Sequence, residues 1–249
     1  PVTAGDFDGD GDDDIAVGAP GNNSAGEDAG AVYLLLSDET ERSGTANLSH
    51  ETDAVLAGVE AGDRAGFAVA SLPLGAANDD AGADADAEVD ALVVGAPYND
   101  SAGENAGAVY LVNDVLADGV EPPADPDSLA DVADRTVFGA GASDLAGFDV
   151  ASAGDTDGNG AAEMVIGAPS NNSTGPNAGA AYVLAAKGDS NASVTDGVQL
   201  SGVGQGDHAG WSVAGAGDTD ADGYDDVIVG APYNDSAGNN SGAAYLVSA

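Results

Sequence analysis

Cysteine is absent from this chain of 249 residues, so neither disulfide bonds nor thiolate metal sites hold the fold together. Basic residues are nearly absent as well, because Lys and Arg number 4 against 44 Asp and Glu, and the formal net charge is −40. A charge of this sign and size repels nucleic acid and anionic membrane surfaces. We therefore expect no nucleic-acid partner, whereas cationic partners remain open.

Long hydrophobic runs are also missing. No stretch of about 18 apolar residues is available to span a bilayer. The first residues show no basic segment followed by an apolar one, as a signal peptide would. We expect no membrane insertion within this segment, and we expect any signal or anchor to lie outside the residues given.

Groups that commonly serve in catalysis are scarce too. His50 and His208 are the only histidines, and no GxSxG nucleophile elbow supports a Ser-His-Asp triad. Lyase chemistry would need a base and a cation that stabilises charge, and the chain offers few candidates for either. The sequence therefore predicts a protein that is not an enzyme, with no catalytic residues.

What the chain does contain is small and acidic residues, including 38 Gly, while 43% of its residues are hydrophobic. This hydrophobic fraction occurs in short runs and argues against disorder. Self-repulsion of a chain with net charge −40 is tolerable where salt screens it. The Debye length falls to about 3 Å at roughly 1 M salt. We therefore expect a halophilic source.

A VGAP or IGAP tetrapeptide recurs four times and sets the organisation of the chain. An apolar run precedes each copy, and a polar turn with a second apolar run follows it, which predicts a β-hairpin. Upstream of the last three copies lies a run that opens with Gly and an aromatic residue, and a fourth run, such as AVLAG, precedes it. The tetrapeptides occupy residues 17–20, 94–97, 166–169 and 229–232.

Four strands per repeat are typical of a propeller blade. The sequence predicts an all-β fold, a β-propeller of four blades that are four-stranded antiparallel sheets. The first and last blades are expected to be incomplete, because the chain opens without a Gly-aromatic start and stops before a fourth strand. The spacer at residues 113–135 is expected to be an extended surface excursion. The single domain divides into blades at about 1–58, 59–140, 141–202 and 203–249.

An acidic loop between the first two strands of a blade carries oxygen-bearing residues at relative positions 1, 3, 5 and 9. Calcium takes about six to eight oxygen ligands at about 2.3–2.6 Å, and a carbonyl at position 7 would add one more. The predicted ligands are Asp6, Asp8, Asp10, Asp12 and Asp14 in the first loop; Asp155, Asp157, Asn159, Ala161 and Glu163 in the third; and Asp218, Asp220, Asp222, Tyr224 and Asp226 in the fourth. Among them, Asp12, Ala161 and Tyr224 are predicted to act through their carbonyls.

These loops are not EF-hands, because their twelfth position is an apolar strand residue in place of a bidentate Glu. Magnesium is the weaker candidate, since it prefers fewer protein ligands and keeps its waters. Acidic residues are also common in turns, but their constant phase relative to the following strand favours three calcium sites. The second loop is a degenerate fourth site, with candidate ligands Asp84, Asp86, Glu88 and Asp90.

The joined pattern AGWSVAGAGDTDADGYDDVIVGAP followed by GAAYLV resembles the FG-GAP repeat of integrin α-chain heads and their prokaryotic relatives. The resemblance extends over nearly the whole chain. It implies a propeller, usually of seven blades, with structural calcium in the loops of one face. It also implies that turns on the opposite face meet a protein or glycan ligand. We therefore expect an extracellular or cell-surface adhesion or binding module of a prokaryote.

Because only four copies are present, three arrangements remain open: a fragment of a larger ring, a closed four-blade ring, or strand donation between subunits. Self-association through open blade edges is possible. The alternative function is a structural subunit of a cell-surface layer or filament assembled by strand or edge pairing. A less favoured alternative is a non-catalytic part of a secreted polysaccharide-active enzyme.

N-glycosylation sequons recur in the turns after GAP. In a secreted protein their asparagines are candidate glycan acceptors on surface loops. Asn, Asp, Ser and Gly also build hairpin turns by themselves, so both interpretations stay open. The candidate acceptors are Asn22, Asn99, Asn171 and Asn234.

Overall fold

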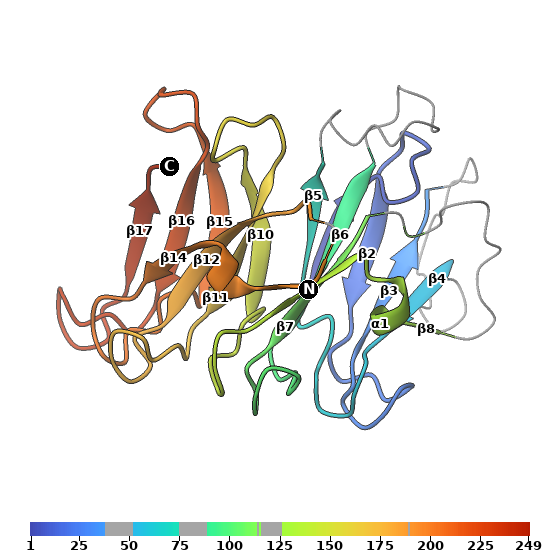
Figure 1. The fold of residues 1–249 in the computed structure, drawn as a ribbon, viewed down its shortest axis with the longest axis horizontal. Coiled ribbons are helices and arrows are strands. Elements are labelled where there is room, and N and C mark those ends of the chain that lie inside the picture. The colour runs from blue at the N-terminus through green and yellow to red at the C-terminus, as the bar shows by residue number, and fades with distance from the viewer. Residues whose placement is uncertain (38–51, 75–88, 114, 116–125, 189) are drawn as a thin grey trace.

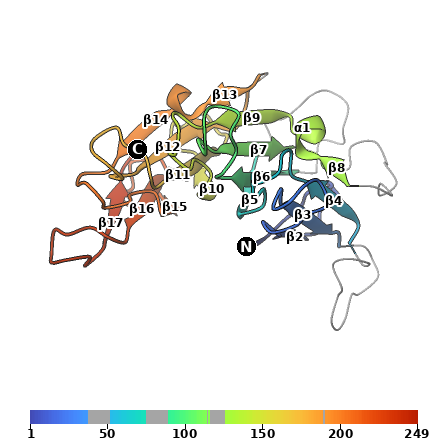
Figure 2. The same cartoon turned by 90° about the horizontal axis from the view of Figure 1, so that it is seen from below.

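The computed structural model describes residues 1–37, 52–74, 89–113, 115, 126–188 and 190–249. Within these ranges the fold is all-β, and four sheets follow one another along the chain as the blades of an open propeller (Figure 1). Figure 2, turned by 90°, shows the same succession from blade 1 near the N-terminus to blade 4 near the C-terminus. No helix in the described ranges is long and apolar enough to cross a bilayer.

Blades 1 and 2 are antiparallel meanders of four strands each. Blade 1 forms its first strand although the Gly-aromatic opening is missing. Blade 1 consists of β1 (Val2–Gly5), β2 (Asp14–Gly18), β3 (Ala31–Leu35) and β4 (Ala54–Ala57). Blade 2 consists of β5 (Ala68–Pro73), β6 (Asp90–Ala96), β7 (Ala108–Val112) and β9 (Arg135–Phe138).

Blade 3 repeats the four-strand meander, whereas blade 4 has three strands among the described residues. The third strand of blade 4 is therefore paired on one side only. Blade 3 consists of β10 (Asp149–Gly154), β11 (Glu163–Ala168), β12 (Ala180–Ala185) and β14 (Val198–Ser201). Blade 4 consists of β15 (Ser212–Gly217), β16 (Asp226–Ala231) and β17 (Ala243–Val247).

Two short strands link neighbouring blades. From the blade 2 spacer, β8 (Asp127–Ser128) pairs in parallel with β4 of blade 1, and from blade 3, β13 (Ala192–Ser193) pairs in parallel with β9 of blade 2. The single helical turns that follow them are α1 (Leu129–Val132) and the 3₁₀ turn Val194–Asp196. Leu129 is completely buried, so the described end of the spacer docks onto blade 1 and is not the surface excursion predicted for it.

The hydrophobic core lies between blades and not inside them. Both faces of each sheet are apolar, and we call the face toward the preceding blade the inner face and the face toward the following blade the outer face. In β6, for example, Leu92 and Val94 of the inner face pack against blade 1, while Val93 of the outer face packs against blade 3. This alternation follows from the two-residue period of a strand. Three such junctions join the four blades.

The glycine of GAP permits this close stacking. A Cβ atom on Gly95 would lie 2.2 Å from the carbonyl oxygen of Gly147, which belongs to the Gly-aromatic pair of the next blade. A Cβ atom on Gly18 would lie 2.2 Å from the Gly66 carbonyl oxygen, and one on Gly167 would lie 2.1 Å from the Gly210 carbonyl oxygen. The two glycine motifs of the repeat are therefore the two halves of one contact between blades. In blade 4, the corresponding Gly230 has its nearest neighbour at 3.4 Å, within its own blade.

Candidate metal centres

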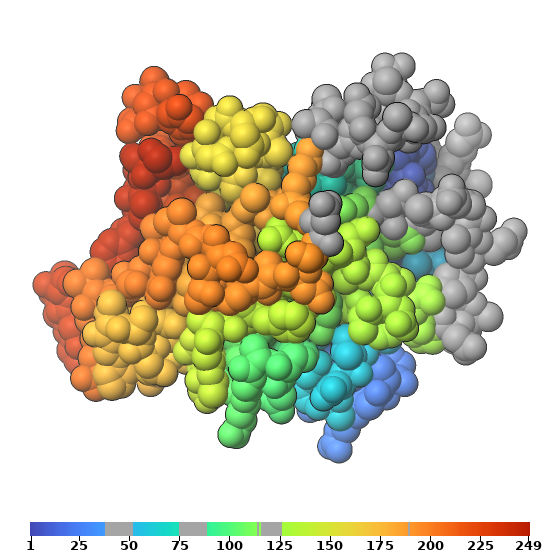
Figure 3. Space-filling view, viewed as in Figure 1, coloured from blue at the N-terminus to red at the C-terminus, as the bar shows by residue number. Residues whose placement is uncertain are grey.

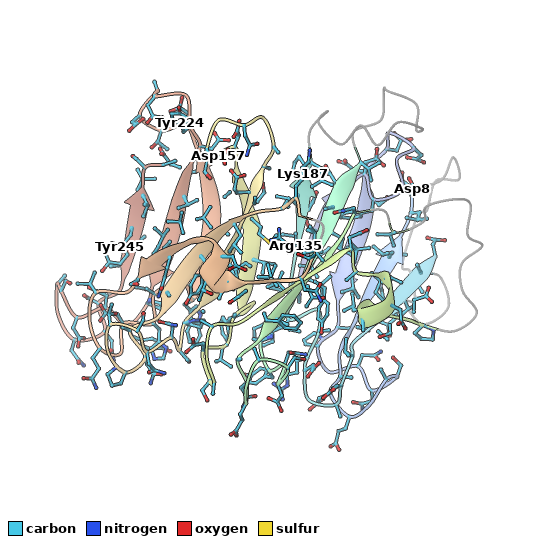
Figure 4. All side chains as sticks on the ribbon, in the orientation of Figure 1. Asp8, Arg135, Asp157, Lys187, Tyr224 and Tyr245 are labelled. Atoms are coloured by element: carbon cyan, nitrogen blue, oxygen red, sulfur yellow. The ribbon has the colours of Figure 1, made fainter. Side chains whose placement is uncertain are left out.

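Three acidic loops connect the first and second strands of blades 1, 3 and 4. Figure 4 labels one residue of each, Asp8, Asp157 and Tyr224, and all three lie along one edge of the molecule. The turns after GAP lie at the other ends of the same strands. The corresponding loop of blade 2 lies outside the described residues, so the ligand roles of Asp84, Asp86 and Glu88 stay predictions.

The first carboxylate of each loop organises the backbone around itself. Asp6 accepts hydrogen bonds from the amides of Gly9 at 2.7 Å and Gly11 at 3.0 Å, one to each oxygen. Asp155 accepts from the amides of Gly158 (2.7 Å), Asn159 (3.0 Å) and Gly160 (2.9 Å), and Asp218 accepts from those of Asp222 (3.1 Å) and Gly223 (3.0 Å). This wrapping requires left-handed backbone, for example φ of 79° at Gly9 and 93° at Gly11, which glycine adopts without strain.

The side chain at position 5 of each loop holds the backbone at position 7 through a hydrogen bond. In each loop its side-chain oxygen accepts a hydrogen bond from the amide two residues later, which holds the peptide at position 7 in place. Carbonyl ligation by Asp12, Ala161 and Tyr224 stays a prediction. The amide of Asp12 donates to Asp10 at 2.8 Å, that of Ala161 to Asn159 at 2.8 Å, and that of Tyr224 to Asp222 at 3.0 Å.

The ninth position is a buried carboxylate at the start of the second strand. Asp14, Glu163 and Asp226 are 0%, 4% and 0% exposed. Burial raises the pKa of Asp14 and of Glu163 above their ordinary values, whereas hydrogen bonds from Thr219 hold the pKa of Asp226 below its usual range. Each accepts a hydrogen bond from the amide that follows position 1: from Phe7 at 2.9 Å, Thr156 at 2.8 Å and Thr219 at 2.9 Å.

Three carboxylates lie close together in each of these loops. In each group, one oxygen of every member lies within 4.8 Å of those of the others. Two ligands of one calcium ion lie at most twice the metal–oxygen distance apart, about 5 Å, so the spacing fits that ion. Asp10 and Asp226 are not among these groups. The members are Asp6, Asp8 and Asp14 in blade 1; Asp155, Asp157 and Glu163 in blade 3; and Asp218, Asp220 and Asp222 in blade 4.

Glu163 carries the clearest sign of a missing partner. Its Oε2 accepts hydrogen bonds from the amide and hydroxyl of Thr156, both at 2.8 Å. Its Oε1 is buried and has no hydrogen-bond partner among the described residues. A buried acceptor without a partner costs free energy, and more so when it is ionised. Because Asp155 and Asp157 stand beside it, a divalent cation fits this position better than a further hydrogen-bond donor does.

Two acidic residues brace the loops from the next blade: Asp225, which lies outside the predicted ligand sets, and Asp90, which was predicted as a ligand of the second loop. Asp225 of blade 4 accepts a hydrogen bond from the amide of Asp155 at 2.9 Å and donates its own amide to the Asp155 carbonyl at 3.0 Å. Tyr224 packs beside Gly158, and Figure 3 shows the loops of blades 3 (yellow) and 4 (red) next to each other. The only sequence signal for Asp225 is the doubled Asp at the end of the loop, which does not distinguish a brace from a ligand.

Asp90 has the corresponding place in blade 2. Its amide donates to the carbonyl of Asp6 at 2.7 Å, and its Oδ2 accepts from the Ser71 hydroxyl at 2.7 Å. Counted back from the glycine of GAP, Asp90 lies one residue earlier than Asp14, and the register position of Asp14 is taken by Ala91. Since a one-residue step turns a strand side chain to the other face, Asp90 is placed as a brace and not at the ninth loop position.

The sequon asparagines in the turns after GAP are structural in three blades. Asn171 is 4% exposed, and its Nδ2 donates to Asp144 Oδ2 at 2.8 Å and to the Tyr182 hydroxyl at 3.1 Å. Burial raises the pKa of Asp144, and it raises that of Tyr182 to about 12. Asn99 and Asn234 make the same bonds to their own Asp and Tyr partners.

An amide nitrogen that donates two buried hydrogen bonds is not presented to a glycosylating enzyme. The acceptor role, one of the two interpretations left open for Asn99, Asn171 and Asn234, therefore conflicts with the folded structure. Asn22 is half-buried and donates to the Tyr33 hydroxyl at 2.7 Å. In these turns the tertiary fold favours the second interpretation of the pattern, a turn-building role.

Comparison with known families identifies the repeat. The family model of the FG-GAP repeat matches residues 2–35 and 209–247. Each match spans the three strands, the acidic loop and the GAP turn of one blade, so the resemblance predicted from the motifs is confirmed for blades 1 and 4. A comparison with curated proteins finds no match to the chain.

Proposed function

From the FG-GAP repeats that this chain contains, we propose that it is an extracellular calcium-binding propeller module that binds a protein or glycan ligand. FG-GAP repeats are typical of extracellular, non-catalytic propeller modules, which supports this class of function over an enzyme. Calcium has a structural role in the proposal. The observation that carries the calcium assignment is the buried, unpartnered Oε1 of Glu163 beside two further carboxylates.

The residues that would hold calcium are the three carboxylate groups. A bound divalent cation supplies positive charge, and that charge offsets the mutual repulsion of the carboxylates. Two like charges about 4 Å apart repel by about 4 kcal/mol at an effective dielectric constant of about 20, and by about 1 kcal/mol in bulk water. Backbone amides of the loop donate hydrogen bonds to the carboxylates and keep them in place, so these side chains are preorganised. Asn159 and the position 7 carbonyls complete the proposed oxygen set.

The proposed ligand face lies at the strand ends opposite the acidic loops. Aromatic side chains gather there, because the Gly-aromatic residues of successive blades contact one another. The ring centres of Phe67 and Phe148 are 4.9 Å apart, and those of Phe148 and Trp211 are 4.8 Å apart. Tyr98 and Tyr233, just after GAP, pack against Phe67 and Trp211. Rigid, partly exposed aromatic rings of this kind are enriched at binding surfaces.

Titration calorimetry with calcium tests the metal sites directly. We expect three sites, and we expect Glu163→Gln to weaken one of them by at least about tenfold, or about 1.4 kcal/mol. The substitution keeps the shape of the side chain but removes its charge. Glu104→Gln, at an exposed position in the GAP turn of blade 2, is the matched control and should leave all three sites unchanged. Equal calcium affinity in both variants at constant ionic strength would contradict the assignment.

Adjacent sequons in blade 3 test which asparagine of the turn is accessible to a glycosylating enzyme. Asn171 is buried, whereas Asn172 is exposed and begins its own sequon, Asn-Ser-Thr. After secretion from a host that glycosylates sequons, we expect the glycan on Asn172 and none on Asn171. Peptide mass spectrometry distinguishes the two. Asn172→Gln should remove the glycan from this turn, and a glycan on Asn171 would contradict the buried hydrogen-bond network.

A further inference from the structure

The two outermost blades each leave one apolar face uncovered. The inner face of blade 1 has Val2 at 66% and Ile15 at 43% exposure, and no described residue packs on it as a preceding blade would. Its paired strands present two rows of side chains without any charge. These rows are Val2, Val17 and Tyr33, and Ala4, Ile15 and Leu35.

The outer face of blade 4 is uncovered in the same way. Ile228 is 39% and Leu246 is 57% exposed, and again no described residue covers them as a following blade would. The two rows at its centre hold no charged side chain, and Asp226, at the loop end of the same face, is already buried, in a chain with 44 acidic residues and net charge −40. Its rows are Ala214, Ile228 and Leu246, and Ser212, Gly230 and Ala244.

The internal junctions show what such faces bind. Between blades 2 and 3, the outer row Ala70, Val93 and Leu111 meets the inner row Val150, Ile166 and Tyr182, and all six residues are buried in one cluster. Between blades 3 and 4, the outer row Ala151, Val165 and Val183 meets the inner row Val213, Val229 and Tyr245.

The uncovered rows have the same strand registers as these buried ones. By register, Ala214, Ile228 and Leu246 of blade 4 correspond to the outer rows that the next blade covers. Val2, Val17 and Tyr33 of blade 1 correspond to the inner rows that cover them. The chain therefore carries both halves of one more blade junction, on two different blades.

We propose that a second copy of this chain docks head to tail, its blade 1 inner face on the blade 4 outer face. The three existing junctions supply the geometry, and because the uncovered rows carry no charge, docking buries no further carboxylate within them. A contact between two different faces is heterologous, so it forms a ring if the rotation closes and an open filament if it does not. The inference defines an interface for the structural alternative to the proposed ligand-binding role, and no proposed calcium ligand belongs to the rows that form it.

The net charge makes this association depend on salt. Copies with charge −40 repel one another over about 30 Å at roughly 0.01 M salt, but over only about 3 Å at roughly 1 M. We expect association at high salt and monomers at low salt. Salt screening does not weaken apolar contacts between the faces. The salt dependence of this association is therefore opposite to that of an interface made of ion pairs, which weakens as salt rises.

Sedimentation velocity of the 249-residue chain and two variants tests the interface. Ile15→Asp places a charge on the inner face of blade 1, and Ile228→Asp places one on the outer face of blade 4. At high salt we expect the parent chain to associate and each variant to raise the apparent dissociation constant at least about tenfold. Mixing the variants should restore one intact interface and give a one-to-one heterodimer. Val203→Asp, at a 77% exposed valine outside both faces, is the control and should associate like the parent.

Three results would overturn the proposal: a monomeric parent chain at high salt, self-association of either variant as strong as that of the parent, or a variant mixture that stays monomeric. If the parent chain stays monomeric at high salt, these two faces do not bind a second copy of the chain. Thermal unfolding verifies that the variants fold. If either does not, Val2→Asp and Leu246→Asp replace them, because these more exposed positions tolerate a charge better. The interface is judged with calcium present, and the runs are repeated with chelator: loss of calcium affects the parent, the variants and the Val203→Asp control alike, whereas failure of the interface appears with calcium present.

Discussion

Removal of calcium is expected to unfold this protein or to bring it close to unfolding. A ligand that binds only the native state adds about 2.7 kcal/mol when its free concentration is about 100 times its dissociation constant. Three independent sites would then add roughly 8 kcal/mol. The whole stability of a typical protein is about 5–15 kcal/mol. Urea unfolding followed by far-ultraviolet circular dichroism, in calcium and in chelator, measures the difference.

The control for this experiment is ionic strength. Because the chain carries a net charge of −40, any added salt screens its self-repulsion and stabilises it without binding at a site. The comparison is therefore made at constant ionic strength, with magnesium as a second divalent cation. We expect calcium to stabilise far more than magnesium, which keeps its waters and suits these loops less well. Equal unfolding midpoints in calcium, magnesium and chelator would show that the carboxylate groups are not metal sites.

Adding one methyl group at the glycine of GAP is the second change with a large expected effect. Gly95→Ala would place a Cβ atom 2.2 Å from the Gly147 carbonyl oxygen of the next blade, so a backbone must move. Overpacking of this kind typically costs about 1–3 kcal/mol, and sometimes more. We expect Gly95→Ala to lower the free energy of unfolding by at least that amount, measured by urea unfolding in calcium.

Gly230→Ala is the matched control, since it is the same substitution at the same motif position in blade 4. Its nearest neighbour is at 3.4 Å and belongs to its own blade, so the methyl group fits with little adjustment. In the monomer we expect a change within about 1 kcal/mol, because alanine also restricts the unfolded chain. Similar losses in both variants would show that the close approach between blades is not what glycine provides there.

The wrapping of the acidic loops was predictable from sequence because their hydrogen bonds are local. Positions 1, 5 and 9 accept hydrogen bonds from backbone amides within the same nine residues, so spacing alone predicts how the loop wraps, although Asp10 and Asp226 are not among the close carboxylate groups. The strands were predictable for a related reason, since each carries an apolar run bounded by turn residues. The joining of two glycine motifs across blades was not predictable, although both motifs were visible, because nothing in the spacing says which glycine meets which.

Residues that act between blades escaped the sequence for the same reason. Asp225 and Asp90 carry the carboxylate group of a metal ligand. Their place in the blade, however, directs them to the acidic loop of the preceding blade, which they brace through hydrogen bonds. The short strand β8 and the turn α1 come from a spacer whose prolines indicated an extended surface segment, yet Leu129 finds a buried place on blade 1. In each case the deciding partner lies far away in the sequence.

The sequence by itself determined the repeat, the all-β architecture and the nine-residue acidic loops, because strand period and turn chemistry operate over a few neighbouring residues. The tertiary structure decided which of two adjacent asparagines is buried, which acidic residue braces a loop, and which apolar faces stay uncovered. Those outcomes depend on the packing of one blade against the next. Burial and hydrogen-bond partners across a junction are set by residues distant in sequence, and no local pattern encodes them.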